Sequence, residues 1–264
     1  MKKRIINFIA GKFRLQKYFE LLHLISLYGM NYGNGGNFRR SGEYFAAQYV
    51  KSKLLKEGTE KLVLFDVGAN IGHYSTQLAN IFSDKKFTIH SFEPSKKTFA
   101  SFINTTSAIP YIVPNNFGFS DTETSLLLYT NDDASMLASL YERNLGHIDI
   151  FMDKTEVIKL TTIDSYCTQN KIGRVHFLKL DIEGHELNAL KGAMEMINSK
   201  KINFIQFEFG GCNIDSRTFF QDFWYLLKDN YHFFRIVKDG IFPITSYKET
   251  LEIFTTINYL LELK

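Results

Sequence analysis

The sequence Asp66-Val67-Gly68-Ala69-Asn70-Ile71-Gly72-His73 decides the fold of this chain. It follows the apolar run Leu62–Phe65, which is typical of a buried parallel strand, and precedes residues 74–82, which have helical character. A strand, a glycine turn and a helix N-terminus together present backbone N–H groups to a ligand. The spacing therefore predicts an α/β sheet with a ligand site at this turn.

Asp66 distinguishes two classes of cofactor. A nicotinamide dinucleotide also binds where a strand, a glycine loop and a helix meet. A carboxylate beside the turn would repel its pyrophosphate, whereas S-adenosylmethionine carries an ammonium and a sulfonium and no phosphate. Asp66 thus favours S-adenosylmethionine. The alternative is a plain strand–loop–helix connection without a ligand.

A second acid follows the next expected strand. Residues 88–92 form this strand, and Glu93-Pro94 comes directly after it. Glu93 lies 21 residues beyond Gly72, close to the offset at which a carboxylate accepts ribose hydroxyls. We therefore expect Glu93 to bind ribose. An ordinary helix-start acid is the other interpretation.

Composition indicates one globular protein rather than a disordered chain. Of its 264 residues, 45% are hydrophobic and 22% are charged. The net charge of +3 is too small to favour a nucleic-acid partner. Cys167 and Cys212 are the only cysteines and lack metal-ligand spacing, which favours a reducing cytoplasm.

The first residues are basic and amphipathic. Residues 2–17 hold six lysines and arginines and no acid. Across residues 1–30, apolar residues recur at helical spacing with breaks at Gly11 and Gly29, and they are Ile5, Phe8, Ile9, Phe13, Tyr18, Leu21, Leu22 and Ile25. Such a helix can contact the inner membrane surface, or it can pack on the domain as a cap or make an oligomer contact. Its apolar run is too short to span a bilayer. The loop at 29–36, rich in glycine and asparagine, is expected to cover the site or to act as a connection.

From Leu62 onward, strands and helices alternate. Strands are expected at 62–67, 88–92, 111–115, 175–180 and 204–207, and helices at 74–82, 95–106, from 161, at 186–197 with a break at Gly192, and at 215–230. Short strands at 126–129 and 157–160 and a loop or short helix at 135–141 interrupt this order, and substrate contacts are expected there. Two final strands, 231–237 and 256–261, are expected around the turn at 238–240.

Acids end each expected strand, at the sheet edge where ligands of open α/β folds bind. They are Asp66, Glu93, Asp181 with Glu183, and Glu208. Beyond the third strand, Ser120-Asp121 joins them, and Asp121 is expected to accept a hydrogen bond from the adenine amino group. Acids gathered in this way need a cationic or hydroxyl-rich ligand, because buried charges without partners are costly.

The densest acidic cluster is the turn that begins at Asp181. Asp181, Glu183 and His185 alternate there, near the expected position of a transferred methyl group. A carboxylate or an imidazole within about 3 Å of an acceptor hydroxyl can take its proton. His185 can equally be a helix-start residue without chemistry. Asp181, Glu183 and Glu208 can also hold a divalent cation, although no spacing requires one.

Five segments together resemble the FkbM-type S-adenosylmethionine-dependent methyltransferases. They are FDVGANIGHY (65–74), FEP (92–94), TTIDSY (161–166), FLKLDIEGHELNALKGA (177–193) and FIQFEF (204–209). The resemblance implies a class I methyltransferase (Rossmann-like) sheet that is mostly parallel with an antiparallel last strand, with helices on both faces and an N-terminal helical extension. The resemblance covers about residues 62–210. The length of the chain favours one α/β domain with an N-terminal extension, and we expect residues 1–60 to be the extension and residues 61–264 the methyltransferase domain.

The resemblance implies O-methylation of a hydroxyl on a sugar, glycolipid, surface-polysaccharide precursor or natural product. The alternatives are a catalytically inactive cofactor-binding partner subunit, or transfer to protein or RNA. Asp181, Glu183, His185 and Glu208 are the expected catalytic residues. The expected cofactor-binding residues are Asp66, Gly68, Ala69, Asn70, Gly72, Tyr74, Glu93, Ser120 and Asp121.

Overall fold

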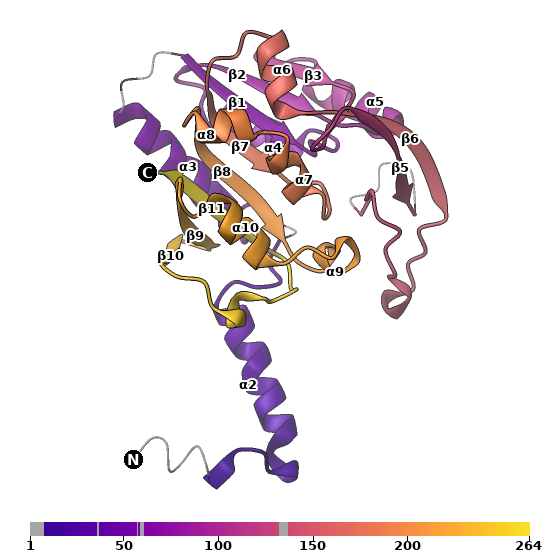
Figure 1. The fold of residues 1–264 in the computed structure, drawn as a ribbon, viewed down its shortest axis with the longest axis vertical. Coiled ribbons are helices and arrows are strands. Elements are labelled where there is room, and N and C mark those ends of the chain that lie inside the picture. The colour runs from indigo at the N-terminus through magenta and orange to yellow at the C-terminus, as the bar shows by residue number, and fades with distance from the viewer. Residues whose placement is uncertain (1–7, 36, 57, 59–60, 132–136) are drawn as a thin grey trace.

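The computed structural model describes residues 8–35, 37–56, 58, 61–131 and 137–264 (Figure 1). Residues 2–7 of the basic segment, Gly36 of the glycine-rich loop and residues 135–136 of the expected loop lie outside these ranges. Across the described residues, no helix combines the length and the apolar composition that crossing a membrane requires.

Within the described ranges, eight strands form the main sheet, in the order β10-β9-β11-β8-β7-β1-β2-β3. The strands from β3 to β8 in this order are parallel, and β11 runs antiparallel to β8. This is the mostly parallel sheet with an antiparallel last strand that was expected, and the fold class is confirmed. Its strands are β1 (Lys61–Val67), β2 (Lys86–Phe92), β3 (Ile112–Asn115), β7 (Val175–Leu180), β8 (Ile202–Phe209), β9 (Tyr231–Val237), β10 (Gly240–Ile244) and β11 (Ile257–Leu263).

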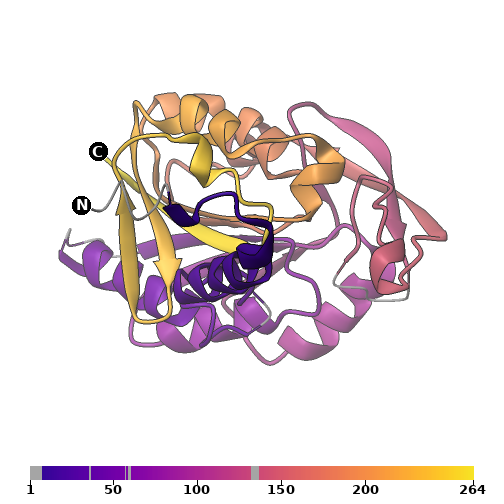
Figure 2. The same ribbon diagram turned by 90° about the horizontal axis from the view of Figure 1, so that it is seen from below.

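Helices cover both faces of this sheet (Figure 2). Helices α3, α4 and α5 lie on one face, where Leu78 and Phe102 pack in one cluster with Leu64 of β1. Helices α6, α7, α8 and α10 lie on the other, where Leu190 and Phe223 belong to a second cluster. The helices are α2 (Gln16–Gly29), α3 (Glu43–Lys56), α4 (His73–Ile81), α5 (Lys96–Thr106), α6 (Ile163–Gln169), α7 (Glu186–Lys191), α8 (Met194–Asn198), α9 (Cys212–Ser216) and α10 (Phe220–Leu227), with single 3-10 turns η1 (Phe13–Leu15), η2 (Gly146–Ile148) and η3 (Glu249–Leu251).

Strand β1 is apolar at successive positions because helices cover both faces of the sheet. Leu62 and Leu64 belong to the core beneath α3 and α4, whereas Phe65 and Val67 belong to the opposite core. Side chains of a strand alternate between faces, so a strand covered on both faces is apolar throughout. The same alternation directs Asp66 toward α3 and α4.

The insertion after β3 forms a second sheet, in the order β4-β6-β5. Its strands are β4 (Gly118–Phe119), β5 (Thr124–Thr130) and β6 (Lys154–Thr161). The short strands expected at 126–129 and 157–160 are both present and pair antiparallel with each other. Leu128, Ile158 and Leu160 form a small core of their own. In Figure 1 this sheet lies to one side of the main sheet.

The N-terminal residues divide into two parts with different surroundings. After α2, Asn31 donates through Nδ2 to the carbonyls of Ser41 and Ile236, and the N–H of Gly33 donates to Thr256, so this segment is fastened to the main sheet. Helix α2 itself stands away from the body, and Leu27 is its only buried residue (Figure 1). The expected cap helix packed on the domain is therefore wrong for α2. An apolar helix face in a sequence indicates that the helix has a contact surface, but it does not identify the surface against which that face packs.

Two other expectations near the C-terminus were wrong. The helix expected at 215–230 is two helices, α9 and α10, since Arg217 adopts a left-handed backbone (φ 54°) between them. Asn213 and Thr218 fix this break by a side-chain hydrogen bond of 2.7 Å. The turn at 238–240 leads into β10 rather than into 256–261, and β11 returns later between β8 and β9.

Candidate active site

The carboxyl ends of β1, β2, β7 and β8 open into a cavity of about 510 Å³. Apolar side chains of the second sheet, such as Phe119 and Leu160, share the lining with ionisable side chains of the main sheet. The expected site residues that line it are Gly68, Ala69, Asn70, Tyr74, Glu93, Asp181, Glu183, His185 and Glu208. The expected substrate contacts of the insertion are consistent with this lining but stay a prediction.

The glycine turn brings two strand ends close together. Gly68 has φ +82°, and a Cβ there would lie 1.8 Å from the carbonyl oxygen of Asp181. The N–H groups of Gly68 and Ala69 both donate to Phe92 at 3.0 Å, and the N–H of Asn70 donates to Glu93. These donors are already used, so a phosphate would find none of these three N–H groups free. The turn suits a cationic ligand better, as its neighbouring acids also indicate.

Asp66 has different surroundings from those expected. Its side chain is fully buried and does not line the cavity. Its Oδ2 accepts a 2.6 Å hydrogen bond from Ser75, and its Oδ1 lies 3.5 Å from Nζ of Lys179. The carboxylate points under the sheet toward α4 rather than into the turn. A direct contact between Asp66 and a cofactor stays a prediction that this geometry does not favour.

Asp66 belongs to a polar row across four parallel strands. The register pairs Ser91 with Asp66, Asp66 with Lys179, and Lys179 with Gln206. Lys179 is buried, lies 3.1 Å from Asp181 and sits 4.4 Å above the ring of Tyr74. Burial would lower the pKa of Lys179, but the charges of Asp181 and Asp66 outweigh it and raise that pKa. Lys179 is therefore a fixed positive charge in the wall of the cavity.

Helices α3 and α4 cover this row with polar side chains. Glu43 accepts a hydrogen bond from Nε2 of Gln206 at 2.9 Å, and the hydroxyl of Tyr74 donates to Oε1 of Gln206 at 3.1 Å. Burial raises the pKa of Glu43 to about 7, although the charge of Lys179 opposes this. Glu43 also lines the cavity, so the first residue of α3 reaches the site.

Glu93 lies where the spacing placed it. Its Oε2 accepts from the N–H of Asn70 at 3.0 Å and its Oε1 from the N–H of Ser95 at 2.9 Å. Burial raises the pKa of this carboxyl to about 7, and the two backbone donors oppose the rise. Glu93 thus fixes the glycine turn and faces the cavity. Its contact with ribose stays a prediction.

Ser120 and Asp121 do not line the cavity. Asp121 is exposed, and its Oδ1 accepts a 3.0 Å hydrogen bond from Ser120. Ser120 is buried against His185, with 2.9 Å between Oγ and Nε2. The adenine contact of Asp121 stays a prediction that this geometry does not favour, because an exposed acid outside the lining does not face a ligand within it.

His185 is held at both ring nitrogens. Its Nδ1 lies 3.0 Å from the hydroxyl of Tyr141 and its Nε2 meets Ser120. Burial lowers the pKa of His185 to about 4, so the ring is neutral at pH 7. A base needs a free nitrogen directed at its proton donor. The geometry favours the structural role of His185, which joins the second sheet to the acidic turn.

The acidic turn is shaped by Glu186. Its carboxylate accepts hydrogen bonds from the N–H of Ile182 at 2.8 Å and of Gly184 at 3.0 Å. Glu183 adopts a left-handed backbone (φ 52°) within this turn. The turn therefore holds Asp181 and Glu183 toward the cavity, where both form part of the lining.

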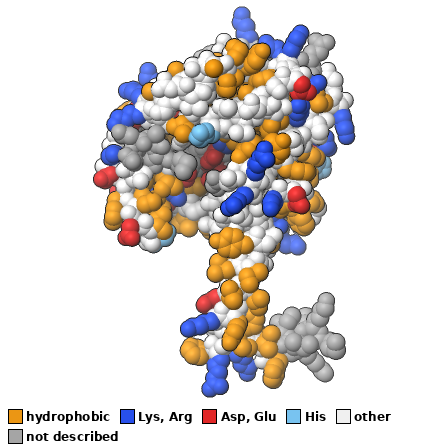
Figure 3. Space-filling view, turned by 180° about the vertical axis from the view of Figure 1, so that it is seen from behind, with side chains coloured by type: hydrophobic (Ala, Val, Ile, Leu, Met, Phe, Trp, Pro, Cys, Tyr) orange, Lys and Arg blue, Asp and Glu red, His pale blue; other side chains and the backbone are white. Residues whose placement is uncertain are grey.

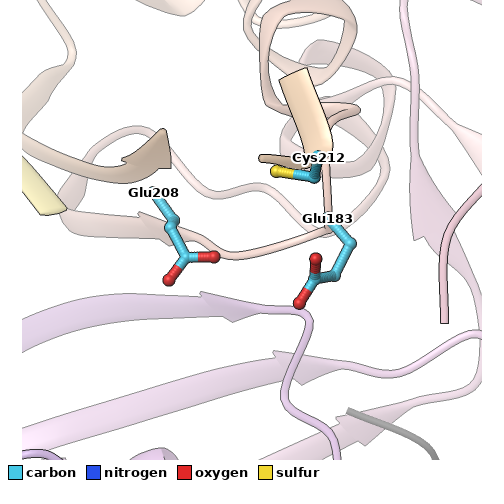
Figure 4. A group of neighbouring side chains, drawn as sticks. All are labelled: Glu183, Glu208 and Cys212. Atoms are coloured by element: carbon cyan, nitrogen blue, oxygen red, sulfur yellow. The ribbon is translucent and has the colours of Figure 1, made fainter. Parts of the chain in front are cut away.

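Three side chains meet beyond this turn (Figure 4). Ligand atoms of Glu183, Glu208 and Cys212 lie within 4.8 Å of one another. Arg143 of the insertion binds Oε2 of Glu183 at 2.7 Å, whereas no hydrogen bond or ion pair joins the Glu208 carboxylate to another described residue. Burial, and then the charges of Asp181 and Glu183, raise the pKa of Glu208 well above its ordinary value. Among the described residues, Glu208 is therefore the site carboxylate with the fewest partners, and it can accept hydrogen bonds from a ligand.

Sequence reasoning missed Lys179, Arg143 and Glu43. Lys179 alternates with Asp181 on β7, and a lysine inside an apolar parallel strand was a signal that a buried acid lies nearby. Arg143 and Glu43 lie in the insertion and the extension, and no local pattern places them at the cavity. The assembled site has a surplus of acids over cations, and it therefore favours a cationic ligand beside a hydroxyl-bearing one.

The Methyltransferase FkbM domain model matches residues 66–234, more than half of the chain. The chain belongs to this FkbM methyltransferase family. Membership confirms the resemblance seen in the sequence and implies S-adenosylmethionine as the methyl donor.

Three named proteins are similar to this chain. AglP of Haloferax volcanii, a hexuronic acid methyltransferase, is 28% identical over 159 residues, which are 60% of this chain and 60% of that protein. A structure of methyltransferase FkbM from Methylobacillus flagellatus KT has a TM-score of 0.47 and 17% identity, over 76% of this chain and 44% of that chain. A putative methyltransferase from Streptococcus mutans, in complex with SAH, has a TM-score of 0.40 and 7% identity, over 77% of this chain and 89% of that chain. The chain thus spans less than two thirds of the first two relatives.

Proposed function

We propose that this FkbM family member is an S-adenosylmethionine-dependent O-methyltransferase. Its acceptor is a hydroxyl of a sugar, glycolipid, surface-polysaccharide precursor or natural product. The observation that carries this proposal is the acid-lined cavity beside a glycine turn whose N–H donors are already used. The hexuronic acid acceptor named for the archaeal relative supports a sugar as the acceptor.

The residues present fit the cofactor. The close approach at Gly68 leaves no room for a side chain, and the acids around the turn complement an ammonium and a sulfonium. Gly68, Ala69, Asn70, Tyr74 and Glu93 would hold it, with the apolar side chains of the second sheet beside the base. When bound, S-adenosylmethionine supplies an electrophilic methyl group.

The chain's own residues then position the acceptor and receive its proton. In-line displacement depends on orientation, which Asp181, Glu183 and Glu208 supply by accepting hydrogen bonds from a polyol. Lys179 holds the Asp181 carboxylate in place at 3.1 Å, so that Asp181 can accept the hydroxyl proton. His185 stays in the proposed site as the residue that locks the turn.

A divalent cation at Asp181, Glu183 and Glu208 stays a prediction. Arg143 already neutralises Glu183 and Lys179 already neutralises Asp181, so each would compete with a bound cation. Among the described residues, Cys212 rather than Asp181 groups with Glu183 and Glu208, and burial raises the pKa of its thiol. These contacts favour a reaction that proceeds without a metal.

We also propose that residues 61–264 are the methyltransferase domain and residues 1–60 an extension that completes its cavity. Gly33, Gly35 and Glu43 line the cavity, which supports a contribution of the extension to the site. A cytoplasmic location, peripheral at the inner membrane surface, accords with the free thiols of Cys167 and Cys212 and with the basic residues before Glu20. The inactive-partner alternative is weakened by the ordered acidic turn, and transfer to RNA by the small net charge.

Asp181→Asn tests the proposal. Purified protein is screened against nucleotide-sugars and glycan fragments, with mass spectrometry for the gain of one methyl group. With an acceptor identified, Asp181→Asn should lower turnover by roughly 10²–10⁴, the range for a lost general base, and leave S-adenosylmethionine affinity nearly unchanged. Asp239→Asn, in the exposed β9–β10 turn, is the control.

A chelator arm of the same assay separates a direct base from a metal site. Activity that survives chelation and falls in Asp181→Asn supports the base. Full activity of Asp181→Asn would show that this residue is not the general base. Loss of wild-type activity on chelation would instead support a divalent cation in the site.

A further inference from the structure

Helix α2 carries an uncovered apolar surface that stands clear of the body (Figures 1 and 3). The surface, here called the α2 face, comprises side chains that are each between 52% and 66% exposed. Just before it, Phe13 is 92% exposed. The residues of the α2 face are Tyr18, Leu21, Leu22, Leu24, Ile25 and Tyr28. Apolar side chains gathered in this number on one element mark a contact surface.

The α2 face is too broad for a simple helix pair. At 3.6 residues per turn, its six side chains spread over about 160° of the helix circumference. The two-helix seam of a coiled coil is narrower than this. Gln16, Glu20 and His23 lie on the opposite side together with Phe19 and the buried Leu27, and Lys17 lies within the apolar arc, so the exposed apolar side chains are concentrated on one half of the helix. This division suits a helix that lies at the boundary of an apolar phase.

The charges near α2 also discriminate between occupants. Lys12, Arg14 and Lys17 are exposed at its far end, and Glu20 is the single acid of η1 and α2. A second copy packed in parallel would bring these cations against their own kind. An antiparallel copy would place them beside the end of α2 that holds Ser26 and Gly29, where no acid of the helix neutralises them. An anionic lipid surface complements them directly.

We propose that α2 docks the protein on an anionic membrane surface, with the α2 face in the headgroup boundary and the basic residues on lipid phosphates. The helix leads through Asn31 directly into Gly33 and Gly35 of the cavity lining. Docking therefore places the cavity near the membrane, where a lipid-linked acceptor is held. The docking itself does not depend on the proposed methyl transfer.

Vesicle co-sedimentation of the full chain tests this inference. The vesicles are phosphatidylcholine alone, or with 30% phosphatidylglycerol. Two variants are compared with the wild type: Lys12→Gln/Arg14→Gln/Lys17→Gln, and Leu21→Ser/Leu22→Ser/Ile25→Ser. The control is Leu127→Ser/Phe151→Ser/Val157→Ser, which removes exposed apolar side chains of the insertion.

We expect wild type and control to bind the anionic vesicles and the neutral ones far less. The charge variant should lose about 100-fold in partitioning, at about fivefold for each cation removed. The apolar variant should lose binding to both vesicles, with an unchanged thermal midpoint, since its residues are exposed. Methylation of a water-soluble acceptor should persist in both variants, which separates this result from the proposed function.

Two outcomes overturn the proposal. One is equal, negligible binding of the wild type to both vesicles. The other is a stable dimer in sedimentation velocity that Leu21→Ser/Leu22→Ser/Ile25→Ser dissociates while vesicle binding stays unchanged, which would assign the α2 face to a second copy.

Discussion

At the scale of single residues, the polar row beneath the cavity explains why acids cluster at this site. Lys179 stands between Asp66 and Asp181, at 3.5 Å and 3.1 Å from their carboxylate oxygens. A buried charge without a partner costs several kcal/mol, so the lysine and its acids require one another. Asp66 thus serves the site indirectly, by holding the lysine that fixes Asp181.

Glu93→Ala tests the ribose assignment. The loss of two charge-assisted hydrogen bonds to ribose should cost roughly 2–4 kcal/mol of S-adenosylmethionine binding, discounted for water. Titration calorimetry measures this, with the exposed Glu249→Ala as control. Because Glu93 also fixes the turn through Asn70 and Ser95, Glu93→Gln is compared as well, since it removes the charge but keeps one oxygen that can accept from either backbone N–H. Binding within threefold of wild type would refute the assignment, and NADH binding as tightly as the methyl donor would refute the cofactor.

At the scale of elements, the site depends on close approach between strand ends. The turn after β1 meets the turn after β7 at Gly68, and the second sheet joins the acidic turn through Tyr141 and Ser120 on His185. Neither contact involves residues adjacent in sequence. The insertion is consequently part of the cavity wall rather than an appendage of the domain.

Gly68→Ala tests this approach. A Cβ at Gly68 would lie 1.8 Å from the carbonyl oxygen of Asp181, in a backbone conformation that L-residues rarely adopt. We expect a loss of roughly 2–4 kcal/mol in the free energy of unfolding, or displacement of the acidic turn with weaker cofactor binding. Gly173→Ala is the matched control, because its Cβ would meet no atom within 4 Å. Denaturant titration gives the stabilities, and equal values for both variants would contradict the expected strain.

At the scale of the whole molecule, the fold concentrates acids on one edge. Burial raises the pKa of Glu43, Glu93 and Glu186 to about 7 each, and it lowers the pKa of His90 and His185 to about 4. The acids favour folding below their unfolded pKa and lose this contribution as the pH rises to 7. The two histidines act in the opposite sense: their contribution to the stability of the folded protein is lost as the pH falls from 6.5 to 4.

Glu186→Gln isolates one of these contributions. In the wild type, the Glu186 carboxyl should stabilise the folded protein below pH 4.5, and this stabilisation should disappear as the pH rises through 7. The corresponding change in the free energy of unfolding is about 3 kcal/mol. The glutamine cannot ionise, and its oxygen can still accept from Ile182 or Gly184. The thermal midpoint of Glu186→Gln relative to wild type should therefore rise between pH 5 and pH 8. Glu20→Gln, exposed on α2, is the control, and a difference independent of pH would disprove this account.

The sheet, the family and nine of the residues that line the cavity could be predicted from the sequence alone. Local signals were sufficient there: the apolar run before Asp66, the glycine turn and the acid 21 residues beyond Gly72 each act over a few neighbouring positions. It also determined that α2 is helical and ends at Gly29.

Which acids face the cavity, and which cations neutralise them, became clear only from the three-dimensional packing. Strand alternation and register turned Asp66 onto Lys179, and packing of the insertion brought Arg143 to Glu183. Likewise, the sequence showed that α2 is apolar, and the fold alone showed that nothing in the described chain covers it. The physical reason is the same in each case: periodicity fixes the face of an element, whereas the partner of that face is chosen by contacts between distant segments.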